Sequence, residues 1–224
     1  RINQNYMPLP FTGTKTVLTG QVKKGRAVAT LDIDFKRVKA LSKRLRASAN
    51  EIMLCVFDIA VHRQLADSGQ TFKKALYTNM PINLRKPGET TYGNKIAIVP
   101  VQFEMLGLSN WVKPIANILI SNMPGPSDIM FFKDSQLLAS YPISTITPGG
   151  GVNITMMTYR GQANIGLVCC NNNIDSLEPL ARYCDEAFDM LEKCIDDPSL
   201  NIKDIGEEIN DGSVANVDDE PFNN

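Results

Sequence analysis

The 224-residue chain has a single histidine, His62, and none of the common nucleotide or hydrolase signatures. A lone histidine late in an apolar stretch lacks a partner with which to activate a nucleophile, so we interpret His62 as structural. Gly-x-Ser-x-Gly is absent, which argues against a serine hydrolase. Gly-x-Gly-x-x-Gly is also absent, which argues against dinucleotide binding. Basic residues are not interleaved with aromatic ones, so we expect no nucleic-acid partner.

Long apolar runs and paired cysteines are also missing. No run approaches the ~20 residues that cross a bilayer. The chain starts Arg-Ile-Asn-Gln, without an initiator Met or an apolar signal segment, so we expect it to begin inside a longer cytoplasmic polypeptide. An odd cysteine count without metal-ligand spacing predicts reduced, buried thiols and no metal site. The five cysteines are Cys55, Cys169, Cys170, Cys184 and Cys194.

Charge is distributed unevenly along the chain. The formal net charge is −1, but residues 195–224 hold nine acidic residues and one lysine, and therefore carry −8. The preceding 194 residues carry +7. A polar, acidic segment poor in large apolar residues is typical of a solvated or disordered tail.

Three helices are predicted from apolar spacing and cap residues. Asp34 is expected to cap the first, which presents Phe35, Val38, Leu41 and Leu45 on one face. The second is capped near Ser48 and runs from about Asn50 to Leu65; its apolar residues on most sides predict a buried helix. The last spans about Asp175 to Cys194, with an apolar face of Leu177, Leu180, Ala181, Cys184, Phe188 and Leu191.

Strands are predicted around these helices. They cover 27–33, 75–82, 95–103, 152–159 and 163–170, and the apolar run in 95–103 predicts a strand buried on both faces. Residues 129–132 and 137–143 predict a hairpin with its turn at 133–135. In 152–159, Asn153, Thr155, Met157 and Tyr159 share one face. Pro148-Gly149-Gly150-Gly151 precedes a strand rather than a helix, so we interpret it as a turn and not as a phosphate loop.

The most informative stretch is Ile120-Ser121-Asn122-Met123-Pro124-Gly125-Pro126. An apolar run from Asn117 enters it, and proline ends a strand because it lacks the N–H of the ladder. Gly125 between two prolines suits a sharp turn with an accessible backbone. The hydroxyl of Ser121 and the amide of Asn122 therefore either satisfy the turn or stand ready at a strand end for chemistry.

Ser121 to Pro126 resembles the Ser-Asn-x-Pro-Gly-Pro motif of the bacterial wax ester synthase/acyl-CoA:diacylglycerol acyltransferase family, within the chloramphenicol-acetyltransferase-like superfamily. Further similar stretches follow the family's order: Asn50-Glu51 for Asn-Asp, Pro81 to Arg85 for Pro-x-Ser-x-Arg with Asn83 replacing Ser, Gly93-Asn94, Tyr141-Pro142, and Asn153 with Thr158 to Gly161. The family's catalytic His-His-x-x-x-Asp-Gly is not in this chain. The family also has a long insertion after the position of Met105, so we expect residues to be missing there.

The resemblance implies an α/β fold, in the form of an α+β sandwich: a chloramphenicol-acetyltransferase-like lobe with a mixed, mostly antiparallel sheet flanked by helices. Residues 1–26 would be the inter-lobe crossover, 27–194 the C-terminal lobe and 195–224 the tail. It implies acyl transfer from acyl-CoA, as co-substrate without a bound cofactor, to a long-chain alcohol or diacylglycerol. The base would be a histidine of an N-terminal lobe, with the active site between the lobes.

The resemblance also implies site residues and partners. Asn50, Ser121 and Asn122 would support catalysis, and Arg85, Gly93, Asn94, Pro124, Gly125, Asn153 and Tyr159 would bind substrate. Partners would be the N-terminal lobe, acyl-CoA, and fatty alcohol or diacylglycerol, with peripheral contact to membrane or lipid inclusions. The basic residues around 36–46 would be either a solvated face or a site for coenzyme A phosphates or anionic headgroups. The alternative function is a non-catalytic lipid- or acyl-CoA-binding module.

Overall fold

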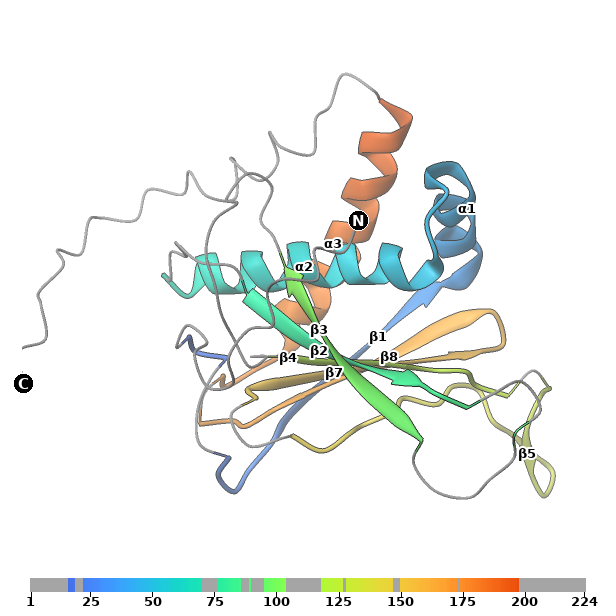
Figure 1. The fold of residues 1–224 in the computed structure, drawn as a ribbon. Coiled ribbons are helices and arrows are strands. Elements are labelled where there is room, and N and C mark those ends of the chain that lie inside the picture. Colours follow the sequence, from blue (N-terminus) through green and yellow to red (C-terminus); the bar gives the residue numbers. More distant parts are fainter. Residues whose placement is uncertain are drawn as a thin grey trace, which may run out of the picture.

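A computed structural model shows three helices stacked on one face of a six-stranded sheet (Figure 1). It describes residues 16–18, 22–69, 76–85, 89, 95–103, 118–126, 128–146, 150–172 and 174–197. The elements are β1 (Ala27–Asp34), α1 (Phe35–Leu45), α2 (Ala49–Asp67), β2 (Leu76–Asn83), β3 (Ile96–Phe103), β4 (Ile118–Met123), β5 (Phe131–Phe132), β6 (Ser135–Gln136), β7 (Val152–Tyr159), β8 (Gln162–Cys169) and α3 (Glu178–Asp196).

The sheet has the strand order β1-β8-β7-β4-β2-β3. β4 runs parallel to both of its neighbours, whereas the other three pairings are antiparallel. This confirms the mixed, mostly antiparallel sheet flanked by helices. β5 and β6 form a separate two-stranded hairpin, which stands apart from the main sheet in Figure 1.

The predicted helix caps are present. The side chain of Asp34 accepts a hydrogen bond from the Lys36 amide at 2.9 Å. At α2, Ser48 accepts from the Glu51 amide at 3.2 Å while Glu51 accepts from the Ser48 amide at 2.6 Å, a reciprocal capping box. These local bonds fix where α1 and α2 begin, and therefore which residues of α2 face the sheet.

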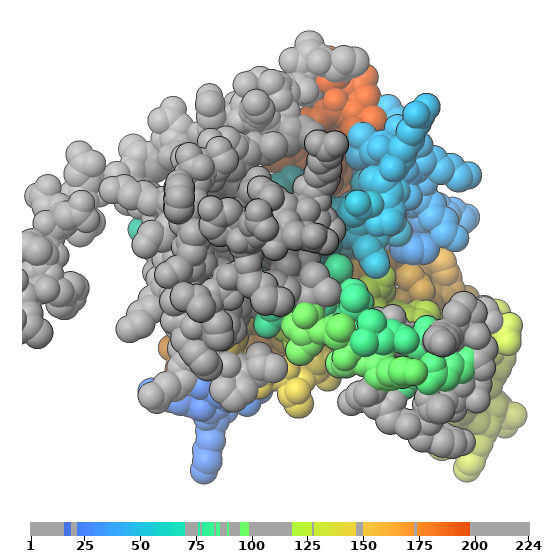
Figure 2. Space-filling model, in the orientation of Figure 1, coloured from blue at the N-terminus to red at the C-terminus, as the bar shows by residue number. Residues whose placement is uncertain are grey.

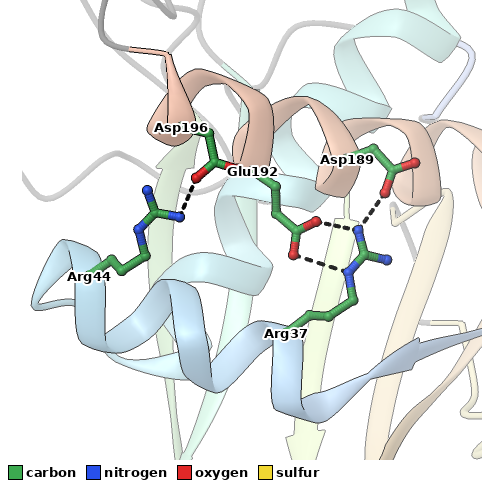
Figure 3. Close-up of polar contacts among 5 residues, drawn as sticks. All are labelled: Arg37, Arg44, Asp189, Glu192 and Asp196. Carbon is green, nitrogen blue, oxygen red and sulfur yellow. Dashed lines mark hydrogen bonds and ion pairs between the residues drawn. The ribbon is translucent and has the colours of Figure 1, made fainter.

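α2 lies in the middle of the core, as its apolar composition predicts. Its buried residues pack with the apolar face of β7 and β8 and with α3, whose predicted apolar face is buried throughout. α1 joins α3 through charge: Arg37 lies 2.5 Å from Asp189 and 2.5 Å from Glu192, and Arg44 lies 2.6 Å from Asp196 (Figure 3). Hydrogen bonds from Arg37 to Glu192 and Asp189 raise the pKa of its guanidinium.

Several sequence-based expectations are wrong. β3 is the outermost strand of the described sheet and is not buried on both faces, since Ile96 and Ile98 are 48% and 58% exposed. Pro100 within β3 suits an edge position, where a missing N–H leaves no ladder bond unmade. The hairpin strands are two residues each, so 137–143 is not a strand. Cys55 is exposed, although the other four cysteines are buried, and all five are free thiols.

The hydrophobic core and helix α3 extend beyond the predicted lobe of residues 27–194. Leu18, in the predicted crossover, is 1% exposed and belongs to the hydrophobic core. Helix α3 continues to Asp196, two residues into the predicted tail. Residues 104–117, where we expect missing sequence, and the tail from residue 198 lie outside the described residues.

Candidate active-site cleft

The sheet divides where β4 reaches the Ser-Asn-Met-Pro-Gly-Pro stretch. β2 and β4 pair only at Thr78–Ile118 and Asn79–Leu119, a junction at which the Thr78 hydroxyl donates to the Ile118 carbonyl at 3.0 Å. Beyond it, β4 continues beside β7 as far as Met123, whereas β2 continues beside β3. The neighbouring strands β2 and β4 therefore part, and their diverging ends are the walls of a cleft.

The cleft has a volume of about 380 Å³ and is open to solvent. Its lining residues come from α1, α2, β2, β4, β7 and the Pro-Gly-Pro turn: Phe35, Asn50, Met80, Pro81, Ile82, Asn122, Pro124 and Thr158. A small hollow adjoins it and adds Met53, Leu54, Phe57, Ile120, Ser121 and Met156. The site thus combines an apolar interior with two asparagines that line both spaces.

Those two asparagines contact each other although 72 positions separate them. The Asn122 amide Nδ2 donates to Asn50 Oδ1 at 2.5 Å. Asn122 lies one residue before the end of β4, and Asn50 lies in the first turn of α2. The first-turn N–H groups and the positive end of the helix dipole are therefore beside the cleft, where they favour a developing negative charge.

Glu51, which the resemblance places opposite the family's Asp, caps the helix. Its carboxylate accepts from the Ser48 amide, and its own amide donates to the Ser48 hydroxyl. The backbone hydrogen bond from Ser48 is the largest cause of a lowered pKa of Glu51. Because this carboxylate is engaged as a cap, the extra methylene relative to Asp has a structural explanation.

The Pro-Gly-Pro turn lies against β7. Pro124 ends β4 and lines the cleft. A Cβ added to Gly125 would lie 1.9 Å from the Thr158 carbonyl oxygen, so only glycine permits this approach. The turn therefore fixes the positions of Pro124 and Thr158, which lie on the same wall.

Other predicted site residues are not brought to this cleft. Asn153 and Tyr159 are 1% and 2% exposed and point to the face opposite α2. There Asn153 donates to the Thr145 carbonyl at 2.9 Å, and the Tyr159 hydroxyl donates to the Leu137 carbonyl at 3.0 Å. Their side chains hold residues 137–145 against the sheet, a role we did not predict from the sequence.

Ser121, Arg85 and the Gly93-Asn94 pair have different positions. Ser121 borders the small hollow, but strand alternation turns its side chain toward the same face as Thr155, away from the side on which Asn122 lies. Arg85 follows β2, is partly buried and does not line the cleft. Gly93 and Asn94 lie outside the described residues.

His62 is buried in α2, 4% exposed, and lines neither the cleft nor the hollow. Its Nδ1 lies 2.8 Å from the Asp58 carbonyl oxygen and 2.7 Å from Asp58 Oδ1. Burial lowers the pKa of His62, but the hydrogen bonds and charge of Asp58 outweigh it and the pKa is raised. Within the described residues, no cluster of three metal-ligating side chains is present, and no helix is long and apolar enough to span a bilayer.

The sequence did not identify Phe35, Met80 and Ile82 as cleft residues, because apolar side chains in a helix start and a strand carry no chemical signal. Thr158 and Pro81 lie within stretches that resemble family motifs, so the motif matches were a usable signal for both.

Comparisons with known proteins agree with the family resemblance seen in the sequence motifs. Residues 88–192 match the family model for the WS/DGAT C-terminal domain. A putative diacylglycerol O-acyltransferase of Mycobacterium tuberculosis H37Rv is 24% identical over 225 residues, covering 78% of this chain and 45% of the relative. A probable diacylglycerol O-acyltransferase of strain CDC 1551 is 23% identical over 231 residues, covering 82% and 49%.

Solved structures show the same fold. The wax ester synthase/diacylglycerol acyltransferase of Marinobacter aquaeolei VT8 superposes with a TM-score of 0.65 at 18% identity, over 82% of this chain and 52% of that one. The epimerization domain of tyrocidine synthetase B superposes with a TM-score of 0.53 at 11% identity, over 88% and 54%. The chain spans about half the length of the curated relatives it matches. The chain is therefore similar to the wax ester synthase/diacylglycerol acyltransferase family, and its residues 88–192 match the C-terminal domain of that family.

Proposed function

We propose that this chain is the C-terminal half of an O-acyltransferase that moves an acyl group from acyl-CoA to a long-chain alcohol or diacylglycerol. The observation that carries the proposal is the hydrogen bond from Asn122 to Asn50 at the cleft where the sheet divides. It joins Asn122 of the Ser-Asn-Met-Pro-Gly-Pro stretch to Asn50 of the stretch that resembles the family's Asn-Asp motif, and it does so at the positive end of a helix.

The reaction needs a base and a group that stabilises the oxyanion. The alcohol oxygen attacks the thioester carbonyl while a base takes its proton, and the carbonyl oxygen becomes an anion before the thiolate leaves. The Asn50 side chain uses its oxygen, Oδ1, to accept the hydrogen bond from Asn122. The two N–H groups of the Asn50 amide are not used in that bond. We assign these N–H groups, with the positive end of the α2 dipole, to the oxyanion, and assign Asn122 to positioning Asn50.

The apolar interior suits the substrates. Met53, Leu54, Phe57, Met80 and Ile120 surround the hollow next to the asparagines. An acyl chain or the alkyl chain of the alcohol gains by leaving water for such a surface, at roughly 25 cal/mol per Å². Two asparagines beside an apolar hollow match a lipid whose reacting group is a thioester or a hydroxyl.

The base is assigned to an N-terminal lobe of the intact polypeptide. His62 is buried beside Asp58 and lines neither the cleft nor the hollow. The half-length match to the relatives supports a second lobe. So does the exposed apolar surface between residues 129 and 143, where Phe131, Phe132 and Leu138 are 61%, 79% and 74% exposed. A surface of this kind marks a contact with protein or lipid, so it fits both the second lobe and a lipid surface.

The test is acyl transfer by the intact polypeptide. With palmitoyl-CoA and hexadecanol or dioleoylglycerol, we expect turnover by the intact protein and none by the 224 residues alone. Asn50→Ala in the intact protein should lower kcat/KM by about 10²–10³, the loss of one oxyanion donor. Ser121→Ala should cost less, because its side chain faces the other side of the sheet. Binding of acyl-CoA without turnover by the intact protein would instead favour a non-catalytic lipid-binding module.

A further inference from the structure

Six basic residues lie within helix α1 or directly after it, and the fold divides them into two groups. Arg37 and Arg44 lie seven positions apart, on the side facing α3, where Asp189, Glu192 and Asp196 pair with them (Figure 3). These two charges are paired with carboxylates within the fold.

The other four form what we call the α1 stripe: Lys36, Lys39, Lys43 and Arg46, all exposed. They are spaced three, four and three residues apart, so they lie on one face over about 15 Å. No described carboxylate forms an ion pair with any of them. The helix contains no acidic residue, and the nearest one, Asp34, is engaged as the helix cap. Figure 2 shows this region, in blue, uncovered on the face in view.

The α1 stripe begins at the cleft. Phe35 is the first residue of α1 and lines the cleft, and the Lys39 ammonium lies 5.2 Å from the centre of the Phe35 ring. A ligand that leaves the cleft past Phe35 therefore meets Lys39 first and the rest of the stripe after it. Its anionic end would be attracted by charges that no described acid offsets.

We infer that the α1 stripe binds the phosphate groups of acyl-CoA while the thioester lies in the cleft. The inference rests on the proposed function for its ligand. Acyl-CoA carries its phosphates at the far end of a flexible arm from the thioester, which matches a cleft with polar donors followed by an exposed line of cations. Lysine acts here as a point charge for phosphate, a role in which exposure to solvent limits each contact to a modest gain.

The experiment compares two double variants of the intact polypeptide. Lys39→Gln with Lys43→Gln removes two charges from the α1 stripe. Lys23→Gln with Lys24→Gln removes two exposed lysines before β1, at the end of that strand remote from α1. We expect the first to raise KM for palmitoyl-CoA about five-fold, as two exposed ion pairs of ordinary strength would, and the second to leave KM unchanged.

A substrate without phosphates separates the charge effect from any other. With S-palmitoyl-pantetheine, wild type and the Lys39/Lys43 variant should have the same KM, and added salt should raise KM for palmitoyl-CoA more in wild type than in that variant. Equal KM values for palmitoyl-CoA in both double variants would overturn the inference.

Two further measurements separate other causes. If the Lys39/Lys43 variant keeps its KM but loses sedimentation with phosphatidylglycerol vesicles, the stripe binds lipid headgroups and the inference is wrong. If the intact polypeptide shows no turnover, equilibrium binding of palmitoyl-CoA still tests the stripe. Weaker binding by that variant alone would then support the stripe while the proposed acyl transfer fails.

Discussion

Replacing each asparagine of the cleft by aspartate separates catalysis from folding. Asn50→Asp keeps Oδ1 as an acceptor for Asn122 but replaces the amide N–H groups with an oxygen. Asn122→Asp keeps the size of the side chain but removes the donor that bonds Asn50 at 2.5 Å. An ionised carboxylate cannot donate a hydrogen bond. Asn50→Asp therefore loses the donor assigned to the oxyanion, and Asn122→Asp loses the donor to Asn50, with little change in the shape of either side chain.

The structure sets different magnitudes for stability and for rate. Asn122 and Asn50 are both exposed, so their hydrogen bond contributes no more than about 1 kcal/mol to folding. A carboxylate in the first turn of α2 is favoured by the helix dipole by roughly 0.3–1 kcal/mol, so Asn50→Asp should unfold at or above the wild-type temperature. The same change should cost about 3 kcal/mol of transition-state stabilisation, or 10²–10³ in kcat/KM.

The assay measures kcat/KM for palmitoyl-CoA and hexadecanol beside thermal unfolding of each variant. Asn171→Asp is the control, since Asn171 follows β8 at the opposite end of the sheet. A double-mutant cycle with Asn50→Ala and Asn122→Ala should show that the second change adds little to the first, because Asn122 acts through Asn50. Wild-type turnover in both aspartate variants would refute the assignment, as would a rate loss that merely parallels unfolding.

Three further predictions concern the framework around the cleft. Gly125→Ala should lower the free energy of unfolding by about 1–3 kcal/mol, because its Cβ would lie 1.9 Å from the Thr158 carbonyl oxygen; urea unfolding measures this change, and an unchanged midpoint would show that the turn can move away from β7 without cost. Ser48→Ala should cost about 1 kcal/mol by removing the cap of α2, and an unchanged urea midpoint would show that the capping box is dispensable. Because the pKa of His62 is raised in the fold, stability should be greatest below its ordinary value of 6.5 and fall as pH rises through the raised pKa; His62→Gln should flatten that profile, and an unaltered slope would contradict the reasoning.

Sequence patterns predicted most of what depends on near neighbours in the chain. Asp34 and Ser48 cap helices through bonds to residues two and three positions away, so their roles are legible without the fold. The apolar spacing of α3 and the prolines that end β4 are local in the same way. The likeness to family motifs added the mixed sheet and the order of elements, which local patterns cannot supply.

Other properties depend on what lies beside a residue in space. An apolar run predicted burial for β3, but the strand order leaves β3 at the edge, with Ile96 and Ile98 exposed. Asn153 and Tyr159 belong to a motif-like stretch, yet the pleat of β7 turns them to the face away from the cleft. Six basic residues near α1 look alike in sequence, and only the position of α3 decides that Arg37 and Arg44 are neutralised.

The sequence by itself determined the caps, the strand end at Pro124 and the likeness to the family's motifs, since each depends on residue types in a short stretch. Tertiary structure alone decided that Asn50 and Asn122, 72 positions apart, share a hydrogen bond at one cleft. The reason is the pairing of the strands: β4 leaves β2 after two residue pairs, and the space that opens between them lies under the first turn of α2. No short stretch of sequence encodes a separation between two strands.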